Sequence, residues 1–254
     1  MKKISKTVST SVGDVAIIFQ PAKGGGEGPL VVFLHGWGSD RSIWKDQIAS
    51  CAQATLAIDL PGFGGSPEPD NLLLVADYST AVSEIIGKCG REEVIIVGHS
   101  FGGQVAVELA ARQPEWLAGL VLVASASLRS KSRPILSRLG ELVGPVFRLP
   151  LLRRLRPAIY QLIGADLPPE SETMRATMRQ VLRTDQLYRL ADIKVPTQLV
   201  WGDSDTATPL TNGKLIAREI EKSQLTVLSG GHFIFLEQPT AFADILRSFI
   251  NQIT

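Results

Sequence analysis

The sequence predicts an α/β protein: one eight-stranded, mostly parallel sheet with helices on both faces and a helical insertion after the sixth strand. Short continuous apolar runs alternate with helix-length segments, which is typical of strands buried on both faces and joined by right-handed crossovers. A long interval without such runs interrupts the alternation late in the chain. The 254 residues are 44% hydrophobic and 20% charged, which favours a globular protein over a disordered one.

Eight strands are expected from this pattern. Two β-rich segments, 4–10 and 15–20, flank Gly13-Asp14, a turn signal that predicts an antiparallel hairpin. Six apolar runs follow as expected parallel strands: residues 30–34, 55–59, 93–98, 119–124, 197–202 and 224–229. The core helices are expected at residues 41–52, 72–88, 101–112, 211–221 and 239–252.

The long interval between Ala124 and Pro196 holds about 70 residues, several times the common connection length. Helical spacing recurs within it, so the interval predicts structure of its own. Its expected helices cover residues 135–143, 151–164 and 171–190. We therefore expect a core domain of residues 1–125 and 194–254, and a helical cap of residues 126–193.

The sharpest local signal is Gly98-His99-Ser100-Phe101-Gly102, directly after an apolar strand and directly before a helical run. A serine on so tight a strand-to-helix turn needs small neighbours, and the turn would lift its hydroxyl above the carboxyl ends of the strands. The plain alternative is a Gly-Ser loop that only turns the chain. The context favours Ser100 as a nucleophile.

A serine nucleophile needs a base, and the base needs a carboxylate that holds its tautomer. His232 follows the last strand and a double glycine, where a loop can reach back over the sheet, so we expect it to be the base rather than a structural histidine. Asp203 and Asp205 both follow the strand 197–202. Asp205 has the longer reach toward His232 and is the predicted acid, whereas Asp203 is expected to turn the loop.

The loop after the strand 30–34 contains His35-Gly36-Trp37-Gly38. We expect the backbone N–H groups of Trp37 and Phe101 to form an oxyanion hole, with His35 supporting the loop. The expected pocket residues adjoin these elements or lie in the cap: Trp37, Phe101, Leu139, Leu142, Phe147, Tyr160 and Phe233. Any aromatic side chain among these could equally belong to the core.

Four blocks, taken together and in order, resemble the α/β-hydrolase superfamily: HGWGSD at 35, DLPGFGGS at 59, VGHSFGG at 97, and the pair WGDSD at 201 and GGHFIFLEQP at 230. The resemblance implies an α/β-hydrolase fold whose second strand is antiparallel, a cap after strand six, and an acyl-enzyme mechanism without cofactor or metal. Serine at position 100 argues against haloalkane dehalogenases and epoxide hydrolases, which carry aspartate there. The sequence looks most like the small bacterial serine esterases and C-C hydrolases.

The expected activity is hydrolysis of small to medium carboxylic esters, rising with pH as His232 loses its proton. Alternatives that keep the same three residues are C-C bond hydrolysis of meta-cleavage-type products, cofactor-free perhydrolysis, and ligand sensing with negligible turnover. Residues 129–156 carry eight basic side chains and one acidic, a net +7. This segment could attract anionic substrates or lipid surfaces, or it could be a solvated cap face.

The expected partner is a small-molecule ester or related acyl substrate. The net charge of +1 gives no indication of nucleic-acid binding. We find neither a signal-peptide apolar region after the basic start nor an apolar run long enough to span a bilayer. The expectation is therefore a cytoplasmic monomer or homodimer.

Overall fold

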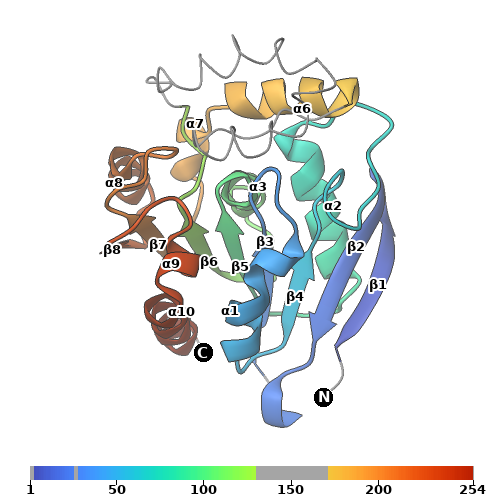
Figure 1. The fold of residues 1–254 in the computed structure, drawn as a ribbon. Coiled ribbons are helices and arrows are strands. Elements are labelled where there is room, and N and C mark those ends of the chain that lie inside the picture. Colours follow the sequence, from blue (N-terminus) through green and yellow to red (C-terminus); the bar gives the residue numbers. More distant parts are fainter. Residues whose placement is uncertain (1–2, 26–27, 130–170, 254) are drawn as a thin grey trace, which may run out of the picture.

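The computed structural model describes residues 3–25, 28–129 and 171–253. Its centre is one eight-stranded sheet with the order β1-β2-β4-β3-β5-β6-β7-β8 (Figure 1). The strands are β1 (Ile4–Thr10), β2 (Gly13–Gln20), β3 (Leu30–Leu34), β4 (Thr55–Ile58), β5 (Val94–His99), β6 (Leu117–Val123), β7 (Thr197–Gly202) and β8 (Ser223–Leu228).

Strand directions follow the sequence prediction. β2 pairs antiparallel with both β1 and β4, whereas β3 to β8 are parallel to one another. This confirms the hairpin and the six parallel strands. In the register, Gly98 of β5 lies between Leu34 of β3 and Leu122 of β6. The carboxyl ends of these three strands therefore meet at one edge of the sheet, where the loops carrying the candidate residues begin.

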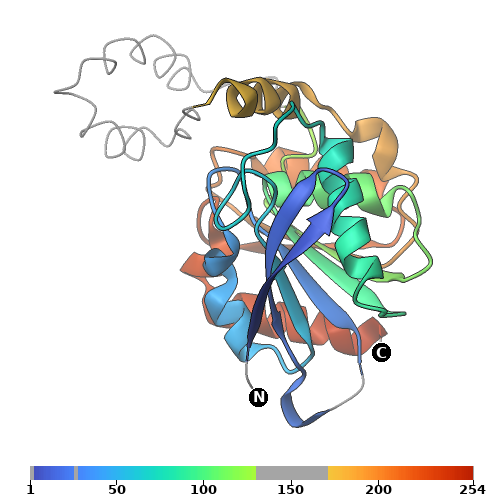
Figure 2. The same cartoon turned by 90° about the vertical axis from the view of Figure 1, so that its right-hand side faces the viewer.

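Helices cover the two faces of the sheet (Figures 1 and 2). Alternate strand residues point to opposite faces, so Leu30 and Val32 join one apolar core while Val31 and Phe33 join another. The first core is covered by α2 (Val75–Gly87), α3 (Phe101–Ala110) and α8 (Leu210–Glu219). The second is covered by the 3-10 helix η2 (Arg41–Trp44), α1 (Lys45–Ser50), α9 (Ile234–Glu237) and α10 (Pro239–Ile253).

Several short helices differ from the prediction. The segment 41–52 is divided into η2 and α1, and α9 was not predicted at all. The expected helix 171–190 is two helices, α6 (Glu172–Arg183) and α7 (Leu187–Leu190). A further short 3-10 helix, η1 (Lys23–Gly25), follows β2. The expected cap helices at 135–143 and 151–164 lie outside the described residues, and the cap boundaries remain a prediction.

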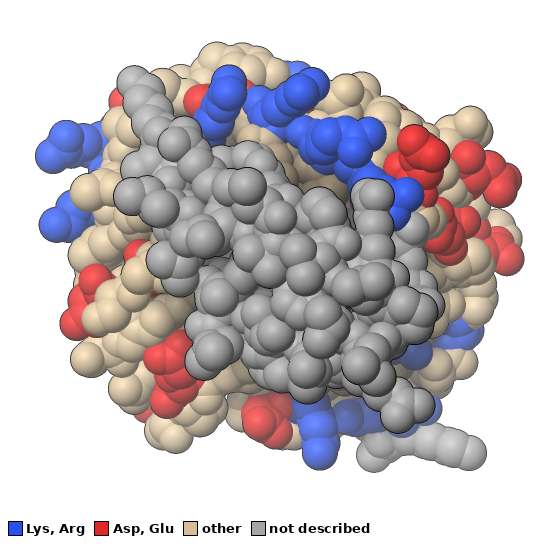
Figure 3. Space-filling model, turned by 45° about the horizontal axis from the view of Figure 1, so that its top comes forward, with Lys and Arg blue, Asp and Glu red and all other residues tan. Residues whose placement is uncertain are grey.

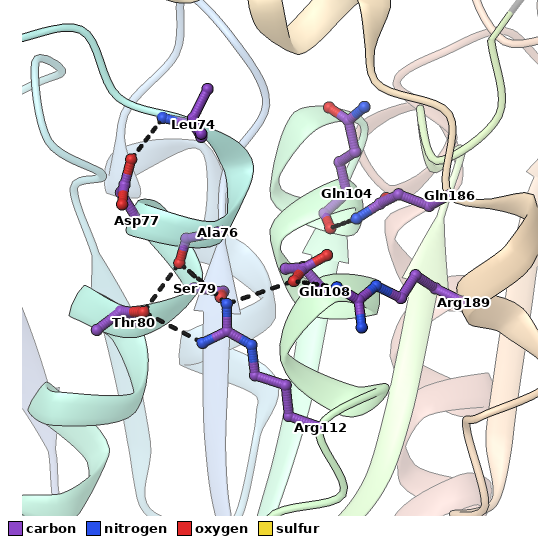
Figure 4. A network of polar contacts seen from close by, with 10 residues as sticks. All are labelled: Leu74, Ala76, Asp77, Ser79, Thr80, Gln104, Glu108, Arg112, Gln186 and Arg189. Carbon is purple, nitrogen blue, oxygen red and sulfur yellow. Dashed lines mark hydrogen bonds and ion pairs between the residues drawn. The ribbon is translucent and has the colours of Figure 1, made fainter.

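A network of polar contacts ties the α6–α7 segment to α3 (Figure 4). The buried side chain of Gln186 donates to the backbone carbonyl of Gln104 at 3.0 Å, and Glu108 forms ion pairs of 3.3 Å with Arg112 and Arg189. The backbone amide of Gln186 also donates to the carbonyl of Ser127 at 2.9 Å. The segment just after β6 and the segment just after α6 are therefore hydrogen-bonded to each other.

Candidate active site

Ser100 occupies a strained turn between β5 and α3. Its φ of 50° and ψ of −111° are unfavourable for a residue with a Cβ atom and cost about 1–3 kcal/mol. Its amide donates to Val123 at 3.0 Å, and its carbonyl accepts from Ala126 at 3.0 Å. These hydrogen bonds to the end of β6 hold the turn, so Ser100 lies just beyond the carboxyl edge of the sheet.

The glycines around Ser100 allow the close approach that the turn requires. A Cβ atom on Gly98 would lie 2.5 Å from the Gly102 carbonyl oxygen, and one on Gly102 would lie 2.4 Å from the Leu34 carbonyl oxygen. Neither backbone atom can move without displacing a strand or helix. The two glycines of the Gly-x-Ser-x-Gly motif are therefore steric requirements of this turn.

Asp205 and His232 are brought together by the loops after β7 and β8. Oδ2 of Asp205 lies 2.9 Å from Nδ1 of His232, and the Asp205 side chain is fully buried. Its other oxygen accepts from the amides of Ala207 and Thr208 at 2.9 Å each. A carboxylate held in this way fixes the tautomer in which Nδ1 carries the proton, and leaves Nε2 as an acceptor.

Thr208 belongs to this cluster, although sequence reasoning missed it. Its hydroxyl lies 2.8 Å from Oδ2 of Asp205, 3.0 Å from the Ala124 carbonyl oxygen and 3.3 Å from Nδ1 of His232. Its position three residues after the aspartate, where a side-chain oxygen can bond back to a turn, is the only sequence signal that could have indicated it.

Asp203 has a different environment. Its carboxylate accepts from the Gly230 amide at 3.1 Å and from the Ser204 hydroxyl at 2.9 Å. The backbone hydrogen bond from Gly230 holds the pKa of this exposed carboxyl below its usual range. Asp203 thus joins the loop after β7 to the loop after β8, a contact between loops that the sequence did not predict.

The loop after β3 packs against Ser100. A Cβ atom on Gly36 would lie 3.3 Å from Cβ of Ser100, so the backbone before Trp37 runs beside the serine. His35 is fully buried; its Nδ1 donates to the Gly36 carbonyl at 2.8 Å, and its Nε2 accepts from the Leu60 amide at 3.0 Å. Burial lowers the pKa of His35, so the ring is neutral. Its two hydrogen bonds join the loop after β3 to the backbone at Leu60.

The proposed oxyanion donors adjoin this loop and α3. Because α3 begins at Phe101, the N–H groups of its first turn have no acceptor within the helix. The rings of Trp37 and Phe101 contact each other edge-on, 5.3 Å between centroids. Trp37 also packs on Phe63 at 4.9 Å. The loop after β3 and the start of α3 are therefore held against each other by aromatic contacts.

The expected pocket residues differ in exposure, and some of them are not described. Phe101 is only 2% exposed and belongs to the core, whereas Phe233, beside His232, is 44% exposed. Trp37 is half-buried. The others lie outside the described residues: Leu139, Leu142, Phe147 and Tyr160.

With the top of the molecule turned forward, Lys and Arg side chains line one margin of the face (Figure 3). The exposed residues Arg175, Arg179 and Arg183 follow one another at four-residue spacing on α6. Of the basic segment 129–156, only Arg129 is described.

Residues 3–25, 28–129 and 171–253 contain no group of three His, Cys, Asp or Glu side chains arranged to hold a metal ion. In the same ranges, every helix is too short or too polar to cross a bilayer.

The sheet order, the strained serine between β5 and α3, and the long interval between β6 and β7 define an α/β hydrolase. A family model described as "Alpha/beta hydrolase family" matches residues 31–245. The chain belongs to this family and is a hydrolase.

Similar proteins agree with this assignment. An uncharacterized protein of Mycobacterium tuberculosis is 30% identical over 263 aligned positions, covering 89% of this chain and 76% of that protein. The pimeloyl-[acyl-carrier protein] methyl ester esterase of Aeromonas salmonicida is 30% identical over 251 positions, covering 89% of this chain and 97% of the esterase. A solved hydrolase from Pseudomonas aeruginosa PA01 shares the fold with a TM-score of 0.78 at 24% identity, covering 96% of this chain and 97% of that one.

Proposed function

We propose that the protein is a serine esterase that cleaves small to medium carboxylic esters through an acyl-enzyme, with Ser100 as nucleophile, His232 as general base and Asp205 as the orienting carboxylate. The observation that carries the proposal is the 2.9 Å contact between a fully buried Asp205 carboxylate and His232. Both residues stand at the sheet edge where Ser100 is held in its strained turn.

In the proposed reaction, Oγ of Ser100 attacks the ester carbonyl carbon while Nε2 of His232 takes the hydroxyl proton. The negative oxygen of the tetrahedral intermediate accepts hydrogen bonds from the amides of Trp37 and Phe101. The intermediate then collapses, and the alcohol leaves with the proton from His232. A water molecule, deprotonated by the same nitrogen, releases the acid and restores Ser100.

An ester substrate is supported by the relatives. The Aeromonas salmonicida protein is named as a methyl ester esterase. In our proposal the present chain shares the ester chemistry, and its pocket is completed by Trp37, Phe233 and residues of the segment 126–193. We also propose that this segment is a cap, that no cofactor takes part, and that the protein acts in the cytoplasm as a monomer or homodimer.

The decisive experiment combines covalent labelling with turnover. A fluorophosphonate probe reacts with an activated serine, so it should label the wild type and not Ser100→Ala. Ser50→Ala, which removes an exposed serine hydroxyl at the end of α1, should be labelled like the wild type. A series of p-nitrophenyl esters from acetate upward then measures the acyl-chain length that the pocket accepts.

Two results would overturn the proposal. Labelling of Ser100→Ala at the wild-type rate would place the nucleophile elsewhere. Negligible ester turnover together with rapid cleavage of a meta-ring-fission product would replace the ester with a C-C bond as the substrate. Size-exclusion chromatography tests the expected oligomeric state separately.

A further inference from the structure

His99 is the buried residue directly before Ser100, and the proposed chemistry does not use it. Its side chain is 1% exposed. Its Nε2 lies 3.1 Å from the backbone carbonyl oxygen of His232. A carbonyl oxygen can only accept, so Nε2 carries the hydrogen and donates it. One side chain at the end of β5 thus bonds directly to the backbone of the residue proposed as the base.

The opposite edge of the same ring faces the loop after β3. A Cβ atom on Gly36 would lie 2.9 Å from Nδ1 of His99 and 3.3 Å from its Cε1. On its other sides the ring packs against Phe233 and Phe235, with centroid distances of 5.1 and 4.9 Å. The imidazole therefore fills the space between the loop of the proposed oxyanion hole and the loop of the proposed base.

The remaining nitrogen distinguishes positioning from simple packing. Nδ1 of His99 is buried and has no hydrogen-bond partner in the described part of the chain. An unpaired buried nitrogen costs stability, a cost that an apolar side chain packed at the same position would not carry. Packing alone therefore does not account for an imidazole here, whereas the donation from Nε2 to His232 does.

His99 is not a second base. One nitrogen is engaged with the His232 carbonyl, and the other faces the backbone at Gly36. Burial, with a contribution from His232, holds the pKa of His99 well below its usual value. The ring is therefore neutral at neutral pH, and a second proton would find no acceptor at Nδ1.

We propose that His99 is a positioning residue: by donating to the carbonyl of His232 while packing on Gly36, it fixes the base and the oxyanion loop relative to Ser100. The proposal rests on the proposed esterase function. Loss of the donor would let the loop that carries His232 shift, and a shift of about 1 Å between reacting groups can cost roughly 100-fold in rate.

Two variants separate the donor from the shape of the ring. His99→Phe keeps an aromatic ring and removes the donor, whereas His99→Gln retains an N–H group near the position of Nε2. Val82→Ala removes two methyl groups from a buried side chain of α2. It serves as the control for the effect of a general loss of stability on turnover. For each protein we would measure kcat and KM for p-nitrophenyl butyrate, the fluorophosphonate labelling rate, the Tm, and hydrogen–deuterium exchange of the segment around His232.

We expect kcat and the labelling rate of His99→Phe to fall roughly 10- to 100-fold, with KM nearly unchanged and Tm lowered no more than in Val82→Ala. Exchange around His232 should accelerate in the same variant. His99→Gln should recover most of the rate and the slow exchange, and Val82→Ala should lower Tm without lowering kcat.

The inference would be overturned if His99→Phe kept wild-type turnover and exchange, or if His99→Gln lost as much as His99→Phe. Failure of the esterase proposal looks different, because the wild type itself would then show no ester turnover and no labelling at Ser100. The exchange measurement would still decide in that case whether His99 holds the loop of His232.

Discussion

The hydroxyl of Thr208 and Nδ1 of His232 approach the same carboxylate oxygen, Oδ2 of Asp205, at 2.8 and 2.9 Å. Thr208 also reaches the carbonyl of Ala124, at 3.0 Å. Ala124 itself has a positive φ of 45°, so the end of β6 turns its carbonyl toward this hydroxyl. The threonine links the loop after β7 to the end of β6 and limits how the carboxylate can rotate.

Thr208→Val should therefore lower kcat/KM. Valine has the same shape but offers no hydrogen bond to Asp205, and hydrogen bonds to charged groups are worth about 1.5–3 kcal/mol. If that energy serves to orient Asp205, the loss is roughly 10- to 100-fold. Steady-state kinetics measure it, and Thr208→Ser, which keeps the hydroxyl, is the control. Equal activity of the valine and serine variants would show that the Thr208 hydroxyl does not orient Asp205.

The two aspartates after β7 should respond differently to the same change. Asp205→Asn presents an amide to His232 and favours the wrong tautomer, a change that costs serine proteases about 10⁴-fold in kcat. Asp203→Asn keeps an oxygen for the Gly230 amide on an exposed loop, so kcat should stay within about twofold. Comparison of kcat for the two variants checks the assignment. A larger loss at Asp203 would reverse it.

Glycine-to-alanine substitutions should have opposite effects at the turn of Ser100 and at the end of α2. Gly102→Ala places a Cβ atom 2.4 and 2.6 Å from two backbone oxygens, and overpacking of this kind costs about 1–3 kcal/mol. Gly87, the last residue of α2, has open space at the same position, so Gly87→Ala should stabilise by about 0.5–1 kcal/mol. Thermal denaturation would show a lower Tm for the first variant and a higher Tm for the second.

Stability should fall between pH 7 and pH 5 because of two buried histidines. Burial lowers the pKa of His35 and His99 from the ordinary value of 6.5, so below pH 6.5 the unfolded chain binds protons that the folded protein does not. The free energy of unfolding then decreases as pH falls toward the folded pKa values, by at most about 1.4 kcal/mol per pH unit for each histidine. Above pH 6.5 this contribution is constant.

Urea unfolding at several pH values measures this slope. His99→Phe should remove the contribution of one histidine and flatten the curve. The lowered pKa values of Asp40 and Asp203 act in a more acidic range, because stability from a carboxylate is lost only as pH falls through its folded pKa. An unchanged slope in His99→Phe would mean that His99 takes up protons as readily in the folded protein as in the unfolded chain.

Much of the fold could be predicted because strands covered on both faces leave a strong signal. Val94 to Val97 are all fully buried, and an uninterrupted apolar run of this length is typical of a central strand in a parallel sheet. The central strands were found for this reason. The hairpin was predicted from its turn, where Gly13 has a φ of 118° that glycine adopts readily.

The helix errors have physical causes. Residues 184–186 lie between α6 and α7, where Oδ1 of Asp185 accepts from the Leu187 amide at 3.1 Å and the buried side chain of Gln186 bonds to Gln104 at 3.0 Å. The helix α9 spans only Ile234–Glu237, and four residues are too few to show a period.

At the candidate site, the sequence indicated which loops meet but not how their side chains bond. The positions of Ser100, Asp205 and His232 follow from strand order, since carboxyl ends of parallel strands share an edge. The contacts of Thr208 with Ala124 and of His99 with His232 join segments 84 and 133 residues apart. Nothing in a single sequence specifies such hydrogen bonds.

The hydrogen bond between the Gln186 amide and the Ser127 carbonyl joins the two ends of the chain segment that leaves β6 and returns at α7. When the two ends of such a segment are held together, the entropic cost of closing the loop changes only slowly with the length of the segment. Exchange of residues 130–170 for the matching stretch of another family member should then alter substrate choice while the scaffold still folds. Because its two ends are hydrogen-bonded to each other, the proposed cap is expected to be exchangeable as a unit, in evolution or by engineering.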